Sequence, residues 1–212
     1  MEKNNWQKQR LGKFTASEIY KLLVNGKNGN TFGQTALTYI KEKAAEILTG
    51  EAEQISNKAM EWGTLHEPSA ISAYKKRYGD LGDIEYYGVE NPKFIEHTEF
   101  SGGSPDAVST THLIEVKCPY RSVNHLENLT LTSETFKAEH LEYYAQIQFN
   151  MLLTGKELAH FVSFDPRMAC GEQQLAIIEI PADKIFQNII TQRIALAEIE
   201  LNNLLTKIIQ HE

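Results

Sequence analysis

Two acidic residues and a lysine near the middle of the chain carry the strongest chemical signal. Asp106 is followed, after eight residues, by the run Glu115-Val116-Lys117. Glu115 and Lys117 are two apart, so in a strand their side chains leave the same face, and a hairpin would bring Asp106 beside Glu115. Carboxylates suit Mg²⁺, which keeps open positions for phosphate oxygens, and a lysine can hold or activate a water nucleophile. The pattern predicts metal-assisted phosphodiester hydrolysis, and the alternative is an ordinary surface strand with alternating charges.

Three further polar residues could complete such a site. Glu67 directly precedes Pro68, which predicts either an extended backbone at Glu67 or a new helical turn that begins at Pro68. Tyr143 and Gln146 are three apart on a predicted helix and therefore share one face, from which they could hydrogen-bond a phosphate or the lysine. An exposed glutamate at a helix kink, and two residues that merely cover a core, are the alternatives.

The elements that must position these residues follow from the hydrophobic periodicity. Helices are predicted over 15–24, 35–49, 57–78, 137–153 and 183–210, and the helix over 57–78 is expected to be interrupted at Pro68 and stopped by Gly79. Strands are predicted over 84–89, 94–100, 107–109, 112–118, 158–164 and 174–180. Thr15 to Glu18 match a capping box, Gly102-Gly103 matches a turn, and Val116 and Cys118 alternate inward as in a strand buried on one face. The order predicts an α/β or α+β fold, a mixed central sheet flanked by helices. Because the sequence contains no internal repeat and no linker, residues 1–212 are expected to form a single domain.

Composition limits the classes of protein that need be considered. Of the 212 residues 42% are hydrophobic and 23% are charged, which predicts a globular core. No apolar run approaches the roughly 20 residues of a membrane helix, and the polar N-terminal segment does not resemble a signal peptide, so a cytoplasmic protein without a membrane partner is expected. Two cysteines cannot provide a four-cysteine metal site. The net charge is −7, but residues 1–30 carry six lysines and arginines against two glutamates, which favours a polyanion bound at one place.

Six motifs in one order, spanning residues 10 to 168, resemble those of the bacteriophage lambda exonuclease family, the phage-type recombination nucleases of the PD-(D/E)xK superfamily. They are Arg10–Glu18, Trp62–Glu67, Ser104–Asp106, Glu115–Pro119, Tyr143–Gln148 and Phe164–Met168. The resemblance implies a restriction-endonuclease-like core and Mg²⁺-dependent digestion of linear double-stranded DNA from the 5′ end, with Mn²⁺ able to substitute. It also implies a ring-shaped homotrimer, a single-strand annealing protein as partner, and a phage or prophage origin in a bacterial host.

The same resemblance assigns roles to individual residues. The implied catalytic residues are Glu67, Asp106, Glu115, Lys117, Tyr143 and Gln146, and the implied metal positions are Asp106, Glu115 and Val116. The implied DNA and 5′-phosphate contacts are Arg10, Ser17, Ser104 and Met60, with Met60 as the apolar wedge at the duplex end. Lys27, in the basic N-terminal segment, and Arg121 are expected to contact DNA as well. The family's phosphate-binding arginine follows the Cys-Pro pair by a few residues, whereas here Arg121 comes two positions earlier and Val123 stands at the matching place. A restriction-type endonuclease on the same core, and a catalytically silent DNA-end binding protein, are the alternative functions.

Overall fold

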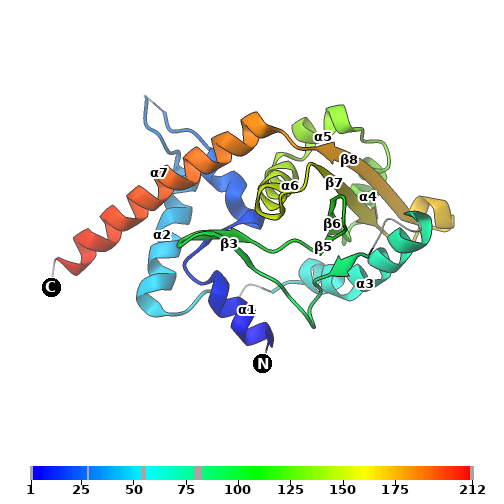
Figure 1. Cartoon of the computed structure of the whole chain (residues 1–212), viewed down its shortest axis with the longest axis horizontal. Helices are drawn as coiled ribbons and strands as arrows, with labels where there is room; N and C mark the ends of the chain where they lie inside the picture. Colours follow the sequence, from blue (N-terminus) through cyan, green and yellow to red (C-terminus); the bar gives the residue numbers. More distant parts are fainter. Residues whose placement is uncertain (1, 28, 54–55, 79–82, 211–212) are drawn as a thin grey trace.

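The computed structural model describes residues 2–27, 29–53, 56–78 and 83–210 (Figure 1). In chain order the elements are α1 (Glu2–Arg10), β1 (Phe14–Thr15), the 3₁₀ helix η1 (Ala16–Leu23), α2 (Gln34–Thr49), α3 (Lys58–Tyr78), β2 (Glu85–Tyr86), β3 (Ile95–Thr98), β4 (Ser101–Gly103), β5 (Ala107–Val108), β6 (Leu113–Lys117), α4 (Ser122–Asn128), α5 (Ser133–Glu139), α6 (Leu141–Thr154), β7 (Leu158–Phe164), the 3₁₀ helix η2 (Gly171–Gln174), β8 (Leu175–Pro181) and α7 (Lys184–Ile209).

The strands form two sheets. The larger has the order β2-β5-β6-β7-β8, in which β6 and β7 are parallel and the other neighbours are antiparallel. The smaller has the order β1-β4-β3, with β1 parallel to β4. The long crossover between the parallel strands contains α4, α5 and α6, as parallel pairing requires. The predicted mixed sheet flanked by helices is therefore confirmed.

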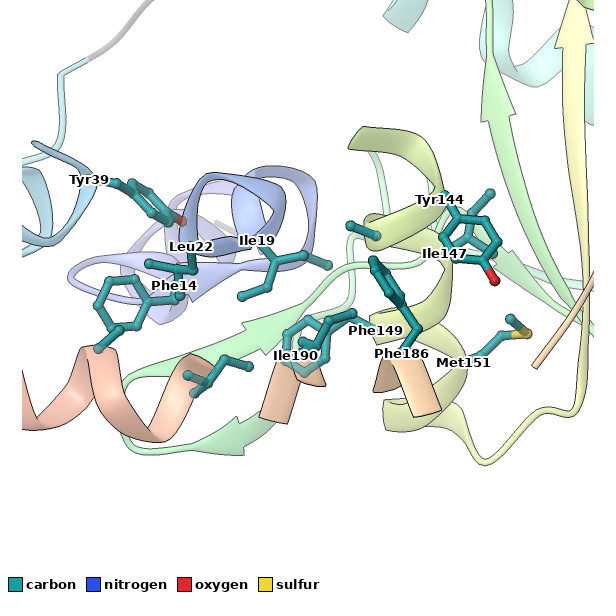
Figure 2. Close-up of a cluster of buried hydrophobic side chains, with 14 of the residues drawn as sticks. Phe14, Ile19, Leu22, Tyr39, Tyr144, Ile147, Phe149, Met151, Phe186 and Ile190 are labelled. Carbon is teal, nitrogen blue, oxygen red and sulfur yellow. The ribbon is translucent and has the colours of Figure 1, made fainter. Parts of the chain in front are cut away.

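Helices cover both faces of the larger sheet (Figure 1). On one face Leu113 and Phe161 join the main core, where residues of η1, α6 and α7 pack together, among them Ile19, Ile147 and Ile190 (Figure 2). On the other face Ile114 and Val162, which follow Leu113 and Phe161 along their strands, pack against α3 in a second cluster. Residues 113–116 are consequently all buried, and the prediction that this strand is buried on one face only is wrong. It is a central strand, for which a continuous buried run is typical.

The segment around Thr15 folds differently from its sequence pattern. Residues 16–23 form a 3₁₀ helix, and the Thr15 side chain makes no capping hydrogen bond. The backbone N–H of Thr15 instead donates to the Tyr39 hydroxyl, 3.0 Å away, and Glu18 accepts a hydrogen bond from Lys21. The predicted capping box is wrong because Thr15 belongs to β1, where it pairs with Gly102.

The Gly102-Gly103 pair lies in β4 and does not form the predicted turn. Both glycines are required by close approach of neighbouring atoms, since a Cβ on Gly102 would lie 2.5 Å from the Ile95 carbonyl oxygen and one on Gly103 would lie 2.3 Å from Asn150 Oδ1. Glycine occurs in a strand where another part of the structure approaches so closely that a Cβ would not fit.

Two predicted helix boundaries also differ. Helix α3 runs through Pro68, so Glu67 has neither of the geometries predicted for it and lies in mid-helix. Proline removes one helical hydrogen bond, but buried residues after it, such as Ile71 and Tyr74, pack on the sheet and hold the helix in place. The predicted helix over 137–153 is two helices, separated at His140, whose φ of −134° and ψ of 57° are not helical.

Other predicted elements agree with the structure. Strands 158–164 and 174–180 are β7 and β8, the helix over 35–49 is α2, and the C-terminal helix over 183–210 is α7. The remaining four predicted strands are present but shorter, α1 and α4 were not predicted, and the predicted stop at Gly79 lies outside the described residues. Within the described ranges no helix has the length and apolarity needed to cross a membrane.

Candidate active site

Glu115 lies at the centre of a cluster of polar side chains between β6 and α6. It is fully buried, and its Oε1 accepts hydrogen bonds from Lys117 Nζ, 2.6 Å away, and from the Gln146 amide. Its Oε2 accepts from Asn150 Nδ2 at 3.2 Å. The spacing of two along β6 places Glu115 and Lys117 on the face that α6 covers. The ring of Tyr143 lies over Lys117, with its centroid 5.3 Å from Nζ. Four of these five residues were proposed from the sequence, and Asn150 was not.

Asp106 approaches this cluster from the segment between β4 and β5. Its Oδ2 accepts a hydrogen bond from the backbone N–H of Val116 at 2.7 Å, so Asp106 is fixed against β6 beside Glu115. Glu67, on α3, is half-buried, and its Oε1 accepts from the hydroxyl of Tyr86 at 3.0 Å. Glu67 interacts electrostatically with Asp106 and Lys117, so acidic groups from α3, from the segment before β5 and from β6 influence one another.

Burial raises the pKa values of the three acids, and repulsion contributes for two of them. Burial, followed by the charge of Asp106, raises the pKa of Glu115 to about 8 and that of Glu67 to about 7. Burial also raises the pKa of Asp106. Burial alone would lower the pKa of the Lys117 ammonium. The negative charges of Glu115 and Asp106 outweigh this effect, so the pKa of Lys117 is raised. One lysine cannot neutralise all three carboxylates once they are ionised, so a cation bound here would stabilise their ionised forms.

The oxygen donors present fit a small divalent cation. Within the described ranges no cluster of three or more His, Cys, Asp and Glu side chains is arranged to share an ion, so a metal here would have few side-chain ligands. Mg²⁺ fits that limit because it is usually bound by one or two carboxylates and retains several waters. Asp106 and Glu115 supply those carboxylates. Val116, also assigned to the metal, could contribute only its backbone carbonyl because its side chain is apolar.

A second polar group lies next to Asp106. Ser104 Oγ accepts hydrogen bonds from Arg10 Nη1 at 3.2 Å and from Trp6 Nε1 at 2.9 Å, and the Arg10 guanidinium stacks over the Trp6 ring at 4.5 Å. Trp6 and Arg10 are four apart on α1, so they share a face. Ser17 and Ser104 each lie two residues beyond the paired Thr15 and Gly102, at the same end of two parallel strands. The bond between Arg10 and Ser104 thus places a guanidinium and a hydroxyl within two residues of Asp106 in the chain.

Comparison with known proteins identifies the family. The family model described as YqaJ-like viral recombinase domain matches residues 5–157. The chain belongs to this family. This assignment confirms the resemblance to the phage-type recombination nucleases. No curated protein sequence matches the chain significantly.

Solved structures resemble this protein along almost its whole length. An alkaline exonuclease, LHK-Exo from Laribacter hongkongensis, has a TM-score of 0.81 and 28% identity, covering 98% of this chain and 97% of that one. LHK-Exo in complex with dAMP has a TM-score of 0.77 and 30% identity, covering 99% and 100%. A phage-related exonuclease from Haemophilus somnus 129PT, at 20% identity, is similar in fold, with a TM-score of 0.75 over 92% and 96% of the two chains. These matches confirm the restriction-endonuclease-like core, and the two LHK-Exo structures support an exonuclease role for this protein.

The other residues proposed to contact DNA lie at the surface of the protein. Arg121 is exposed at the N-cap of α4, and Met60 is 53% exposed in the first turn of α3. Lys27 is exposed between η1 and α2, and Ser17 is exposed in the first turn of η1. Their exposure is compatible with contacts to DNA, and their roles remain predictions.

Three residues of the site were missed in the sequence. Asn150 could have been found, because it lies four residues after Gln146 and so shares its helix face. Trp6 gave only a weak signal, since α1 lacks hydrophobic periodicity. Tyr86 gave none, because its contact with Glu67 joins segments that only the tertiary structure brings together.

Proposed function

We propose that this protein is a Mg²⁺-dependent exonuclease that digests linear double-stranded DNA in the 5′→3′ direction and leaves a 3′ single strand. The observation that carries the proposal is the hydrogen bond from Arg10 to Ser104, two residues before Asp106. It joins a candidate phosphate-binding group to a candidate hydrolytic site. An arginine is suited to bind a terminal phosphate through two parallel hydrogen bonds.

The metal would be held by Asp106 and Glu115, and when bound it supplies charge stabilisation for phosphodiester attack and a more acidic water. Lys117 remains protonated at neutral pH because neighbouring carboxylates raise its pKa. It therefore acts by orienting the attacking water and stabilising negative charge. Glu67, with a pKa of about 7, is suited to accept the proton of that water near neutral pH. Gln146 orients Glu115, and Tyr143 packs over Lys117.

Direction of digestion requires a feature found at only one end of a strand. We assign recognition of the terminal 5′-phosphate to Arg10, Ser17 and Ser104, which could hold each newly exposed phosphate after a cut. Arg121 would provide a further phosphate contact in place of the family's displaced arginine. The similar LHK-Exo forms a complex with dAMP, a nucleoside monophosphate, which supports recognition of a nucleotide phosphate by this protein.

Assembly and partners follow from the same proposal. The basic N-terminal segment, including Lys27, would face the duplex in a homotrimeric ring, while the acidic remainder of the chain faces outward. Met60, exposed at the start of α3, would act as a wedge at the duplex end. The 3′ strand produced would be the substrate of a single-strand annealing protein. A trimeric mass for the active protein is expected in solution, and an active preparation that is strictly monomeric would contradict it.

The test compares linear duplexes that carry a 5′-phosphate or a 5′-hydroxyl, each labelled at one end, with closed circular duplex as control. We expect mononucleotide release from phosphorylated 5′ ends with Mg²⁺ or Mn²⁺, little with Ca²⁺, and none in EDTA. Cleavage of the circle would indicate the endonuclease alternative. Binding of ends without any release would indicate a silent DNA-end binding protein, and release from the 3′ end would contradict the proposed direction.

A further inference from the structure

Asn150 contacts the proposed metal ligand Glu115 from the side that Gln146 and Lys117 leave free. It lies on α6 one turn after Gln146 and is fully buried. Its Nδ2 donates to Oε2 of Glu115, whereas Gln146 and Lys117 both donate to Oε1. Each carboxylate oxygen of Glu115 is therefore held by a different set of donors, and a rotation of the carboxylate group would break both sets.

The carbonyl oxygen of the Asn150 amide contributes no hydrogen bond to the described part of the fold. Its Oδ1 is buried and has no hydrogen-bond partner among the described residues. An unpaired buried carbonyl destabilises a fold because it has lost its water without gaining a donor. A residue kept only for packing would be more stable as an apolar side chain of the same size, so the amide is explained by what its Nδ2 does.

The fold leaves space for this amide oxygen at Gly103. A Cβ at Gly103 would lie 2.3 Å from Asn150 Oδ1. Gly103 ends β4 and directly precedes Ser104, and Asp106 follows two residues later. The Asn150 side chain is thus placed between the strand that carries Glu115 and the segment that leads to the other proposed metal ligand.

We propose that Asn150 is a positioning residue, which fixes the rotation of the Glu115 carboxylate so that Glu115 and Asp106 present their oxygens to one cation. The inference rests on the proposed function, because it takes Glu115 as a metal ligand. Partners of metal-binding carboxylates typically change metal affinity or activity by about 10–100-fold when they are removed. The effect of Asn150 belongs in metal binding and turnover, and DNA affinity is expected to be unchanged.

The test compares Asn150→Leu and Asn150→Ala with a control, Gln148→Leu. Gln148 is buried on the same helix, but its amide bonds the Pro181 carbonyl and the Asp183 N–H, away from Glu115. Three quantities are measured for each full-length variant: the melting temperature, the Mn²⁺ affinity of the DNA-free protein by calorimetry, and kcat and KM on linear duplex. Asn150→Leu should melt at or above the wild-type temperature, bind Mn²⁺ about 10–100-fold more weakly and lose kcat with KM unchanged. Gln148→Leu should melt lower and keep its Mn²⁺ affinity and its kcat per folded molecule.

Asn150→Ala keeps the test decisive if the leucine side chain prevents folding. Wild-type Mn²⁺ affinity and kcat in a folded Asn150 variant, or losses that merely follow the folded fraction, would overturn the inference. Wild-type protein that binds Mn²⁺ but does not digest DNA would instead contradict the proposed function, and weaker Mn²⁺ binding by Asn150→Leu would still support the positioning role.

Discussion

The ammonium of Lys117 lies 2.6 Å from Oε1 of Glu115, two positions back on the same strand. The contact joins a residue with no exposed side-chain surface to one that is about a quarter exposed, so the pair extends from the core to the surface of the site. Glu115 is thereby held where a metal could bind, and Lys117 reaches the region open to substrate. Because the two residues occupy different parts of the site, their roles are tested separately.

Lys117→Ala should abolish turnover and leave DNA binding nearly intact, because the attacking water loses its partner while both proposed metal ligands remain. A loss of kcat of about 10²–10⁴-fold is expected for removal of one group that stabilises charge or a proton in the transition state. Single-turnover digestion gives the rate, and fluorescence anisotropy in Ca²⁺ gives the DNA affinity. Near-normal digestion by this variant would mean that β6 is not the catalytic strand.

Stabilisation of the fold by Mg²⁺ should increase with pH. Without metal, Glu67 and Glu115 have pKa values in the folded state, about 7 and about 8, that are raised above their unfolded values. Their protonated forms therefore favour the fold at low pH, and this contribution is lost as pH rises through 7 and 8. A metal must displace those protons, so it binds more tightly above this range.

The measurement is the rise in melting temperature on adding Mg²⁺ at pH 6 and at pH 9. We expect a small rise at pH 6, a larger one at pH 9, and almost none at either pH for Glu115→Gln. An equal rise at both pH values in the wild type would argue against cation binding by these carboxylates.

Arg10→Ala should remove the preference for phosphorylated 5′ ends. The guanidinium is held by Ser104 and by stacking on Trp6, so its removal takes away a preset phosphate-binding group without disturbing β6. Digestion of 5′-phosphorylated duplex should slow by at least about tenfold, because one hydrogen bond to a charged group contributes about 1.5–3 kcal/mol and about 1.4 kcal/mol corresponds to a factor of ten. Runs along the strand should shorten, and digestion of 5′-hydroxyl duplex should change little. If the wild type treats the two ends alike and Arg10→Ala does the same, this group does not set direction.

A buried histidine pair should make the fold sensitive to acid. The Tyr74 hydroxyl lies 2.7 Å from His112 Nε2 and 2.6 Å from His160 Nδ1. Burial, with a smaller effect of His112, lowers the pKa of His160 to about 4. The neutral ring is favoured in the fold, so its contribution is complete above the unfolded pKa near 6.5 and is lost as pH falls toward 4. The difference corresponds to about 3 kcal/mol.

Urea unfolding of wild type and His160→Gln at pH 8 and pH 4.5 measures this effect. The wild type should lose more free energy of unfolding between the two pH values than the variant, and acids common to both proteins cancel in the comparison. Identical losses would show that His160 titrates normally.

Features set by neighbours in the chain could be predicted from the sequence. The period of the apolar residues predicted α7 and β7 almost to the residue, and the spacing of two predicted that Glu115 and Lys117 share a face. The order of the motifs indicated the family. These properties depend on the repeat of a helix or a strand, which the chain expresses locally.

Only the tertiary structure decided which local signals would be used. Thr15 matched a helix cap, but its N–H was taken by Tyr39, 24 residues away, and Gly102 matched a turn, but it lies beside β3 with no room for a Cβ. Trp6 and Asn150 enter the site because α1 and α6 pack beside Ser104 and Glu115. Burial on both faces of β6 has the same origin. A backbone donor can bind, and a small space beside a strand can hold, only one of several candidate partners. Candidates from distant parts of the chain come close enough to compete only when the chain folds.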